Sequence, residues 1–516
     1  MTTQVTLPDW PWHVVRRVAR ERRRRVWVVG GAVRDALLGR PVHDWDFAVD
    51  GGGMELARAV ADALGGAYFP LDAERDAGRV VLTPEDGPIR ELDFAALRGP
   101  DLEADLRGRD FTINALALDE KGALFDPTGG RTDLEAGRVR ATSAHAFRDD
   151  PVRLLRAARM EAGLGFEIEP RTEAWLRRDA ARVSPPPYAE GGEAAPRRIE
   201  GSGANPSAER VRDELARLMA MRGAAGHVRR LDELGLLSHV VPELESLKGV
   251  AQSPPHRFDV WRHTLLVVDT LEGVTATATG RDVPQASPAD APAAAWGELA
   301  RVLTQFAEDV TGHLAVEVSG RRDRALLLKI AALLHDVGKP ETRSQDEDGR
   351  IHFYNHEPVG AEMARARLRR LRFSGDEIER AGTVVRGHLR PAHLARADTI
   401  TRRAVYRYFR ALGGAGIEVV LLSLADHLAT WGPHLRELRW ARRLETAETL
   451  LTHYFERHEE TVAPPPLLTG HELMRELGLR PGPEVGRLLE VIREAQAAGE
   501  VGSPEEALAL ARRAAA

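Results

Sequence analysis

The stretch VVGGAVRDALLGRPVHDWDFAVD, residues 28–50, decides how the first part of this 516-residue chain is interpreted. It begins with β-branched apolar residues, which predict a buried strand, and it turns at Gly30 and Gly31. A short amphipathic segment follows, and the stretch ends on a second strand-like segment that carries Asp44 and Asp46. This pattern fits either an ordinary strand–turn–helix or a site that holds an anion beside paired carboxylates.

The two aspartates have the chemistry of a metal site. Because side chains at i and i+2 of a strand point to one face, Asp44 and Asp46 can hold one or two Mg²⁺ ions that orient a triphosphate for in-line displacement. The two glycines let backbone N–H groups approach a phosphate at the start of a helix, and Arg34 can bind a phosphate as a fork. Asp93, in the strand-like IRELDFA, is a candidate third carboxylate. Each of these features alone usually has only a structural role, whereas their combination in this order indicates a metal and phosphate site far more specifically.

The composition limits the partners, the metal ligands and the cellular location that we expect for this chain. The chain has 43% hydrophobic and 29% charged residues and a formal net charge of −6, so a nucleic-acid partner would bind local basic faces. Without cysteine, any metal must be held by Asp, Glu or one of 18 histidines. No signal-peptide pattern and no run of 18 apolar residues is found, so we expect a cytoplasmic protein with no membrane partner. The composition favours no particular oligomeric state.

The pattern changes along the chain and predicts a multidomain α+β protein. Strand-like segments give residues 26–140 a mixed α/β character, and from about residue 145 the sequence becomes Arg/Ala/Leu-rich and helical. We predict domains at 1–144, 145–250, 251–460 and 461–516. Two segments rich in Pro, Gly, Ala or polar residues are predicted to be insertions, a disordered one at about 184–206 and a flexible one at about 274–295.

A second constellation lies in the helical part. KIAALLHDVGKP, residues 329–340, is an apolar helix ending in adjacent His335 and Asp336, which can converge on one ion where a helix ends. His263 lies on an earlier apolar helix and Asp426 on a later one, and N and O donors from three helices suit a divalent metal of unknown identity. The order resembles the HD phosphohydrolase superfamily. That resemblance implies that His356 and His388 are the additional ligands of a binuclear centre, and that Lys339 could steady a phosphate.

The N-terminal motifs resemble the class II tRNA nucleotidyltransferase and bacterial poly(A) polymerase family. After GGAVRDALLG and HDWDFAV come DLRGRDFTINALALD (105–119), FDPTGGRTDLEAGRVRA (125–141), RDDPVRLLRAARMEAGLGFEI (148–168) and SAERVRDEL (207–215), in the family's order. The resemblance implies a polymerase-β-like head with a mixed sheet, then an all-α neck and body, an HD-type helical domain and a helical tail. It also implies addition of C and A from CTP and ATP to the tRNA 3′ end by two Mg²⁺ ions.

The resemblance assigns nucleotide binding to further residues. Asp150 and Arg153, at i and i+3, would share one helix face and present a carboxylate and a guanidinium to the base, with Arg109. The remaining expected nucleotide-binding residues are Asp110, Asn114, Arg156 and Arg159. Three arginine-rich stretches, 364–373, 401–412 and 435–445, are candidates for tRNA phosphate contacts, although any one can be an ordinary solvated helix face.

One departure from the family leaves alternatives open. Only eleven residues separate Asp93 from Asp105, whereas this connection is longer in many CCA-adding members, where it is associated with the switch from CTP to ATP. The chain could therefore be a CC-adding specialist. A poly(A) polymerase, and an HD phosphohydrolase with a non-catalytic RNA- or nucleotide-binding head, are further alternatives.

Overall fold

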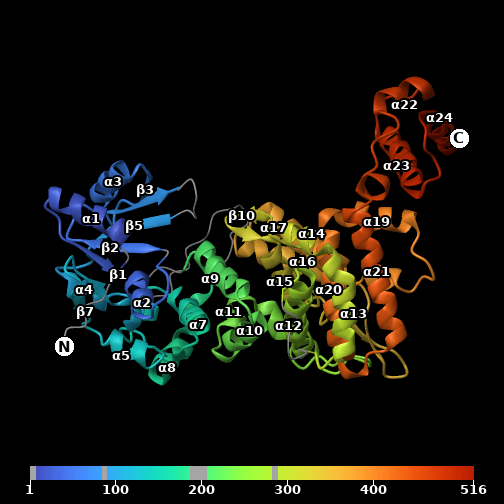
Figure 1. Cartoon of the computed structure of the whole chain (residues 1–516). Helices are drawn as coiled ribbons and strands as arrows, with labels where there is room; N and C mark the ends of the chain where they lie inside the picture. The colour runs from blue at the N-terminus through green and yellow to red at the C-terminus, as the bar shows by residue number, and fades with distance from the viewer. Residues whose placement is uncertain are drawn as a thin grey trace. The chain divides into compact units, whose positions relative to one another are not determined.

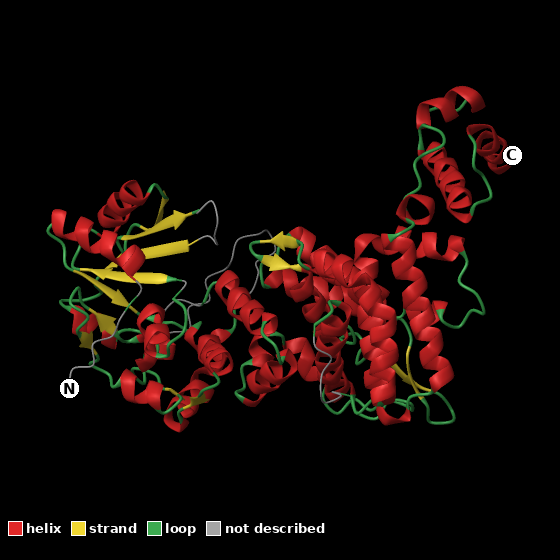
Figure 2. Ribbon diagram, viewed as in Figure 1, coloured by secondary structure: helices red, strands yellow, loops and turns green. Residues whose placement is uncertain are grey.

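The computed structural model describes residues 7, 9–42, 44–83, 90–185, 206–281 and 289–515. The chain divides into two compact units, Met1–Ser207 with Leu234–Leu236, and Ala208–Glu233 with Leu237–Ala516. The boundary at residue 207 falls inside the region 145–250 that the sequence predicts as a single neck and body. The strands are concentrated in the first unit, and the second is almost entirely helical (Figure 2).

The first unit is built on a seven-stranded sheet of order β3-β4-β5-β2-β1-β6-β7 (Figure 1). Its strands are β1 Val26–Val29, β2 Trp45–Val49, β3 Ala67–Asp72, β4 Ala77–Leu82, β5 Arg90–Ala96, β6 Ala117–Leu118 and β7 Leu124–Phe125. Its helices are α1 Asp9–Glu21, α2 Gly31–Leu37, α3 Gly53–Leu64, α4 Leu102–Arg107, η1 Thr112–Asn114, α5 Gly130–Glu135, α6 Ala146–Asp149, α7 Arg153–Leu164, α8 Pro170–Asp179 and η2 Ala180–Val183. A small pair, β8 Arg138–Val139 and β9 Glu167–Ile168, completes it.

Strand alternation decides which face of the sheet carries the aspartates. Trp45, Phe47 and Val49 of β2 are buried on one face, where the Phe47 and Phe94 rings stack 4.7 Å apart. Asp46 therefore points to the opposite face, the one on which a cluster that includes Trp27, Ala48 and Leu106 packs. β2 and β5 pair in parallel with Asp46 opposite Asp93, so the strand register alone brings these two carboxylates together.

The second unit is a helical body. Its larger elements are α9 Ala208–Ala220, α10 Ala224–Glu233, α12 Val260–Ala278, α13 Ala293–Leu303, α14 Ala307–Leu314, α15 Arg324–Leu334, α16 His356–Arg370, α17 Gly375–Gly387, α19 Arg402–Leu412, α20 Gly416–Trp431, α21 Glu437–Phe455, α22 Gly470–Leu477, α23 Pro483–Ala498 and α24 Pro504–Ala515. Shorter ones are α11 Leu237–Val240, η3 Pro242–Leu247, η4 Thr304–Phe306, α18 Arg390–Leu394, η5 Gly413–Ala415, η6 Gly432–His434, η7 His458–Val462 and the hairpins β10 Glu317–Ser319/β11 Arg322–Asp323 and β12 Arg343–Gln345/β13 Ile351–Phe353. The apolar helices α12, α15 and α20 form its buried centre.

Two sequence predictions about linkers can be compared with this fold. Most of the predicted insertion at 184–206 lies outside the described residues. The predicted flexible segment at 274–295 is helical at both ends, because α12 continues to Ala278 and α13 begins at Ala293; residues 282–288 lie outside the described part. The stretch Arg402–His434 has the length and hydropathy of a membrane span, but its most apolar window is 78% buried in the protein, as in a core helix.

Candidate functional site: a carboxylate edge in the first unit and a histidine–aspartate centre in the second

The turn at Gly30 positions the carboxylate edge. Gly30 has φ +71°, and a Cβ added there would lie 3.2 Å from Asp46 Oδ2 and 3.2 Å from an Arg109 Nη atom. A side chain at this position would therefore strain the backbone and would require the carboxylate or the guanidinium to shift by a few tenths of an ångström. α2 begins at the next residue, which confirms the strand–turn–helix predicted from the sequence.

Asp46 lies among charges of both signs. Burial raises its pKa to about 6, an effect that the Arg109 cation opposes and the carboxylates of Asp93 and Asp44 reinforce. Asp44 immediately precedes β2 and is exposed. These carboxylates repel one another, and divalent cations between them would remove that repulsion, so the donor set fits Mg²⁺.

Arg79 of β4 was not singled out in the sequence. It lies opposite Asp93 in the β4–β5 register and binds it through two hydrogen bonds, Nε–Oδ1 at 2.7 Å and Nη2–Oδ2 at 2.8 Å. It also pairs with Glu91 at 2.5 Å. The signal that could have found it is an arginine within the alternating strand AGRVVL, where a charged side chain on the aspartate-bearing face needs a partner.

Four of the expected nucleotide-binding residues form a hydrogen-bonded relay. Arg34 donates to Asn114 Oδ1 (2.7 Å), Asn114 Nδ2 donates to Asp110 (3.1 Å), and Asp110 pairs with Arg156 (3.2 Å). Although burial opposes it, the Arg156 cation and the Asn114 amide hold the pKa of Asp110 below its usual range. The relay joins α2, the RGRDFTIN segment and α7. Arg34 and Arg159 also line a pocket of about 360 Å³, which none of the three carboxylates lines.

The prediction that Asp150 and Arg153 share one helix face is wrong, because the two residues do not lie in the same helix. Pro151 disfavours helical backbone at Asp150, which is extended (φ −148°, ψ 98°), so α6 ends at Asp149 and α7 begins only at Arg153. The Arg153 guanidinium is buried and donates to the backbone carbonyls of Gly108, Arg109 and Ala146. Arg109 itself pairs with Asp105 at 3.1 Å.

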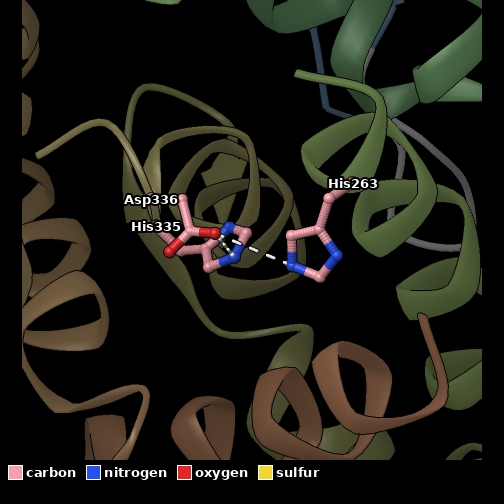
Figure 3. Close-up of side chains that lie close together, drawn as sticks. All are labelled: His263, His335 and Asp336. Carbon is pink, nitrogen blue, oxygen red and sulfur yellow. Dashed lines mark ion pairs between the residues drawn. The ribbon is translucent and has the colours of Figure 1, made fainter. Parts of the chain in front are cut away.

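In the second unit the structure brings together every ligand predicted for the HD centre. His335 and Asp336 follow α15, His263 lies in α12, Asp426 lies in α20, His356 begins α16 and His388 follows α17. The side chains of His263, His335 and Asp336 point toward one another (Figure 3). A second group, Asp336, His356 and His388, shares the same carboxylate, so Asp336 lies between two potential metal positions.

The contacts at this centre fit divalent cations. The Nδ1 atoms of His335, His356 and His388 each contact a backbone carbonyl at 2.7–2.8 Å, which leaves Nε2 of each ring as the ligand atom. The Nε2 atoms of His356 and His388 face each other at 3.3 Å, that of His263 lies 3.0 Å from Asp426, and that of His335 lies 3.1 Å from Asp336. Burial and the neighbouring His335 and His356 lower the pKa of His388 to about 3, so this ring is neutral, as a ligand must be.

The sequence did not point to His256, and it indicated only a phosphate contact for Lys339. His256 lies edge-on to His263 at 4.9 Å between ring centroids, and its Nδ1 is buried without a partner. Its only sequence signal is its place seven residues before His263. Lys339 contacts Asp336 at 2.6 Å, and a Cβ on Gly338 would lie 2.4 Å from the His356 carbonyl, so the HDVGK turn packs directly on α16.

Comparisons with known protein families match segments in both units of the chain. Residues 26–140 match the Poly A polymerase head domain, 204–248 the probable RNA and SrmB-binding site of polymerase A, and 298–431 the HD domain. His263 lies outside the HD match and joins the centre through the fold. The chain has the fold of a CCA-adding enzyme solved with ATP, at TM-score 0.59 and 19% identity, over 98% of this chain and 95% of that one.

The curated relatives extend over nearly the whole chain. It is 39% identical to the A-adding tRNA nucleotidyltransferase of Deinococcus radiodurans, over 94% of both chains. It is 36% identical to the CC-adding tRNA nucleotidyltransferase of Thermus thermophilus, over 93% of this chain and 92% of that one. The chain therefore belongs to the tRNA nucleotidyltransferase family, as its motifs predict, and is an enzyme of CCA-end synthesis that carries an HD domain.

Proposed function

We propose that this enzyme adds C residues from CTP to the tRNA 3′ end and stops at -CC. The observation that carries the proposal is the short connection after Asp93. β5 ends at Ala96 and α4 begins at Leu102, and this turn is held by Asp105, which accepts a hydrogen bond from the Arg98 amide at 3.0 Å. It lacks the longer loop that the family associates with the switch to ATP.

The residues of the carboxylate edge have distinct proposed roles. Asp44, Asp46 and Asp93 would hold Mg²⁺, which supplies charge stabilisation for displacement at the α-phosphate of the nucleotide by the tRNA 3′-hydroxyl. Arg79 fixes the rotamer of Asp93. Gly30 and Gly31 leave the space that a triphosphate needs beside Asp46.

The nucleotide base would be read at the relay. Asp110, Asn114, Arg156 and Arg34 are locked to one another, which gives the rigid donor and acceptor set that base selection needs. Asp150 and Arg109 are proposed to contact the base from the neighbouring segment. Because its guanidinium is committed to backbone carbonyls, Arg153 is assigned a positioning role for the Gly108–Arg109 backbone.

A second candidate is addition of the terminal A. It is favoured by the relative of higher identity, which is A-adding, at 39% against 36% for the CC-adding one. Complete CCA addition and poly(A) synthesis are the remaining outcomes of the same test.

For the HD centre we propose metal-dependent phosphohydrolase activity, because its buried donors fit two cations that share Asp336. The tRNA substrate supports a cytoplasmic location.

The test uses tRNA transcripts ending at the discriminator base, at -C and at -CC, with Mg²⁺ and labelled CTP or ATP. CC addition predicts extension of the first two transcripts by CTP, no use of ATP, and no extension of -CC. Extension of only the -CC transcript by a single A would support the second candidate. Completion to -CCA, or long A tails, would contradict both.

A further inference from the structure

One group of arginines in the second unit lacks acidic partners. Arg396 follows α18, and Arg436, Arg439 and Arg443 lie at the start and along α21. Across the described ranges no carboxylate forms an ion pair with any of these side chains. Arg442 of the same helix differs, since it pairs with Glu445 at 3.1 Å. A set of unneutralised cations on one face indicates a surface that binds an anion.

Uncharged contacts hold the guanidinium groups of Arg436, Arg439 and Arg443 in place. Arg436 and Arg439 lie over the Trp431 ring, with Cζ 5.3 and 5.1 Å from its centroid. Arg443 donates to the hydroxyl of Ser423 at 3.4 Å. Aromatic and hydroxyl contacts orient a cation without cancelling its charge, so the guanidinium forks remain available to an anion.

Buried polar groups beside the arginines are also unsatisfied. Trp440 and His427 stack with their ring centroids 5.9 Å apart, and Trp440 Nε1 and His427 Nε2 are buried without a hydrogen-bond partner. Indole Nε1 can only donate. Burial, together with the like charges of Arg396 and Arg439, lowers the pKa of Arg443, whereas Asp426 acts in the opposite direction. Among the described residues at this position, hydrogen-bond donors and positive charges thus outnumber acceptors and negative charges.

The arginine group adjoins the HD centre. Ser423, which orients Arg443, lies on α20 one turn before Asp426, and His427 follows Asp426 directly. The Asp426 side chain is 20% exposed, whereas that of Asp336 is 1% exposed, so Asp426 is the more accessible of these two carboxylates. A ligand that reaches the centre from the Asp426 side meets the arginines.

We propose that Arg396, Arg439 and Arg443 form a phosphate-binding subsite beside Asp426, which holds the phosphate of an ester presented to the HD centre. The inference rests on the proposed phosphoester chemistry of that centre. The planar fork of arginine matches two phosphate oxygens, and several such forks favour a dianionic group over a carboxylate. The phosphate could belong to a small nucleotide or to the tRNA chain.

The first arm of the test measures binding of a small phosphate ester. The full-length protein in EDTA is titrated calorimetrically with adenosine 3′,5′-bisphosphate, and Arg439→Gln and Arg443→Lys are compared with the matched control Arg442→Gln. The subsite predicts at least tenfold weaker binding for both subsite variants and a change below twofold for the control. The far-ultraviolet circular dichroism spectrum and the thermal unfolding midpoint should be unchanged in all three, which shows that the variants fold.

The second arm measures tRNA affinity against salt concentration with the same variants. If the phosphate comes from tRNA, each lost contact lowers the slope of log K against log salt by about one. A loss in either arm supports the subsite and identifies its source, and no loss in both overturns it. If the arginine-dependent binding is present but Mn²⁺-loaded protein hydrolyses no phosphoester, the subsite stands and the phosphohydrolase proposal fails.

Discussion

Asp46 is the residue on which the chemistry of the first unit depends most directly. Its carboxylate faces Arg109 across the space that Gly30 leaves, and Asp93 is its neighbour in the strand register. Like charges at this density are unfavourable unless cations separate them. Arg79 supplies one fixed cation, and Mg²⁺ is expected to supply the others.

The raised pKa of Asp46 predicts a pH dependence. Because burial raises it to about 6, the folded protein binds this proton more tightly than the unfolded chain, whose carboxyl titrates near 3.8. Without metal, the free energy of unfolding should therefore rise as the pH falls from 6 toward 4 at this site. Mg²⁺ needs the carboxylate, so the Mg²⁺ concentration for half-maximal CMP incorporation should increase below pH 6. An Mg²⁺ requirement that is flat between pH 5 and 7.5 would contradict this.

Replacement of Arg79 should weaken metal binding. In Arg79→Gln, Asp93 loses the two hydrogen bonds that hold its carboxylate in one orientation. We expect at least a tenfold increase in the Mg²⁺ concentration for half-maximal incorporation, measured by titration at fixed CTP. The control is Arg107→Gln, which removes an exposed i,i+4 pair with Glu103 and should leave the requirement unchanged.

Among the elements, the turn between β1 and α2 controls the site through backbone space. Gly30→Ala should reduce incorporation by more than tenfold, since its Cβ would push on Asp46 and Arg109. Gly39→Ala is the matched control, because Gly39 also has positive φ (+66°) but a Cβ there meets nothing within 4 Å. Both variants should lose stability, by roughly 1–2 kcal/mol from backbone strain. Equal loss of activity in the two would show that the clash is irrelevant.

The sequence predicted some elements well and others poorly, for physical reasons. Strand alternation and the glycine pair indicated β1, α2 and β2, because these signals are local. The apolar run before His335 indicated α15 for the same reason. The break at Asp150 was missed, although Pro151 carried its signal. Arg79 could not be assigned a partner, because the β4–β5 register is a long-range feature that no short pattern encodes.

At the scale of the whole molecule, the C-terminal tail changes the interpretation of a basic stretch. Arg407 and Arg410 of α19, expected from sequence to be candidates for tRNA contacts, pair with Glu494 at 2.6 Å and Glu490 at 2.9 Å of α23. Tyr406 also donates to Glu490 at 2.9 Å. The acidic residues of α23 therefore neutralise the charges of Arg407 and Arg410.

This arrangement predicts that Arg407→Gln leaves tRNA affinity within twofold of the wild type. Hydrogen exchange over residues 483–498 should become faster in the variant, although modestly, since solvent weakens an exposed ion pair. Arg442→Gln, outside the α19–α23 contact, serves as the control for exchange. A loss of tRNA affinity of tenfold or more in Arg407→Gln would show that α19 contacts tRNA despite its pairing.

The measurement that tests the central claim most directly compares Asp46→Asn and Asp336→Asn in full-length protein. Both are assayed for CMP incorporation into tRNA ending at the discriminator base and for metal-dependent phosphodiester hydrolysis. If the carboxylate edge performs nucleotide transfer and the HD centre acts separately, Asp46→Asn loses incorporation by at least a hundredfold and keeps hydrolysis, while Asp336→Asn shows the reverse. Incorporation at the wild-type rate in Asp46→Asn would contradict the account.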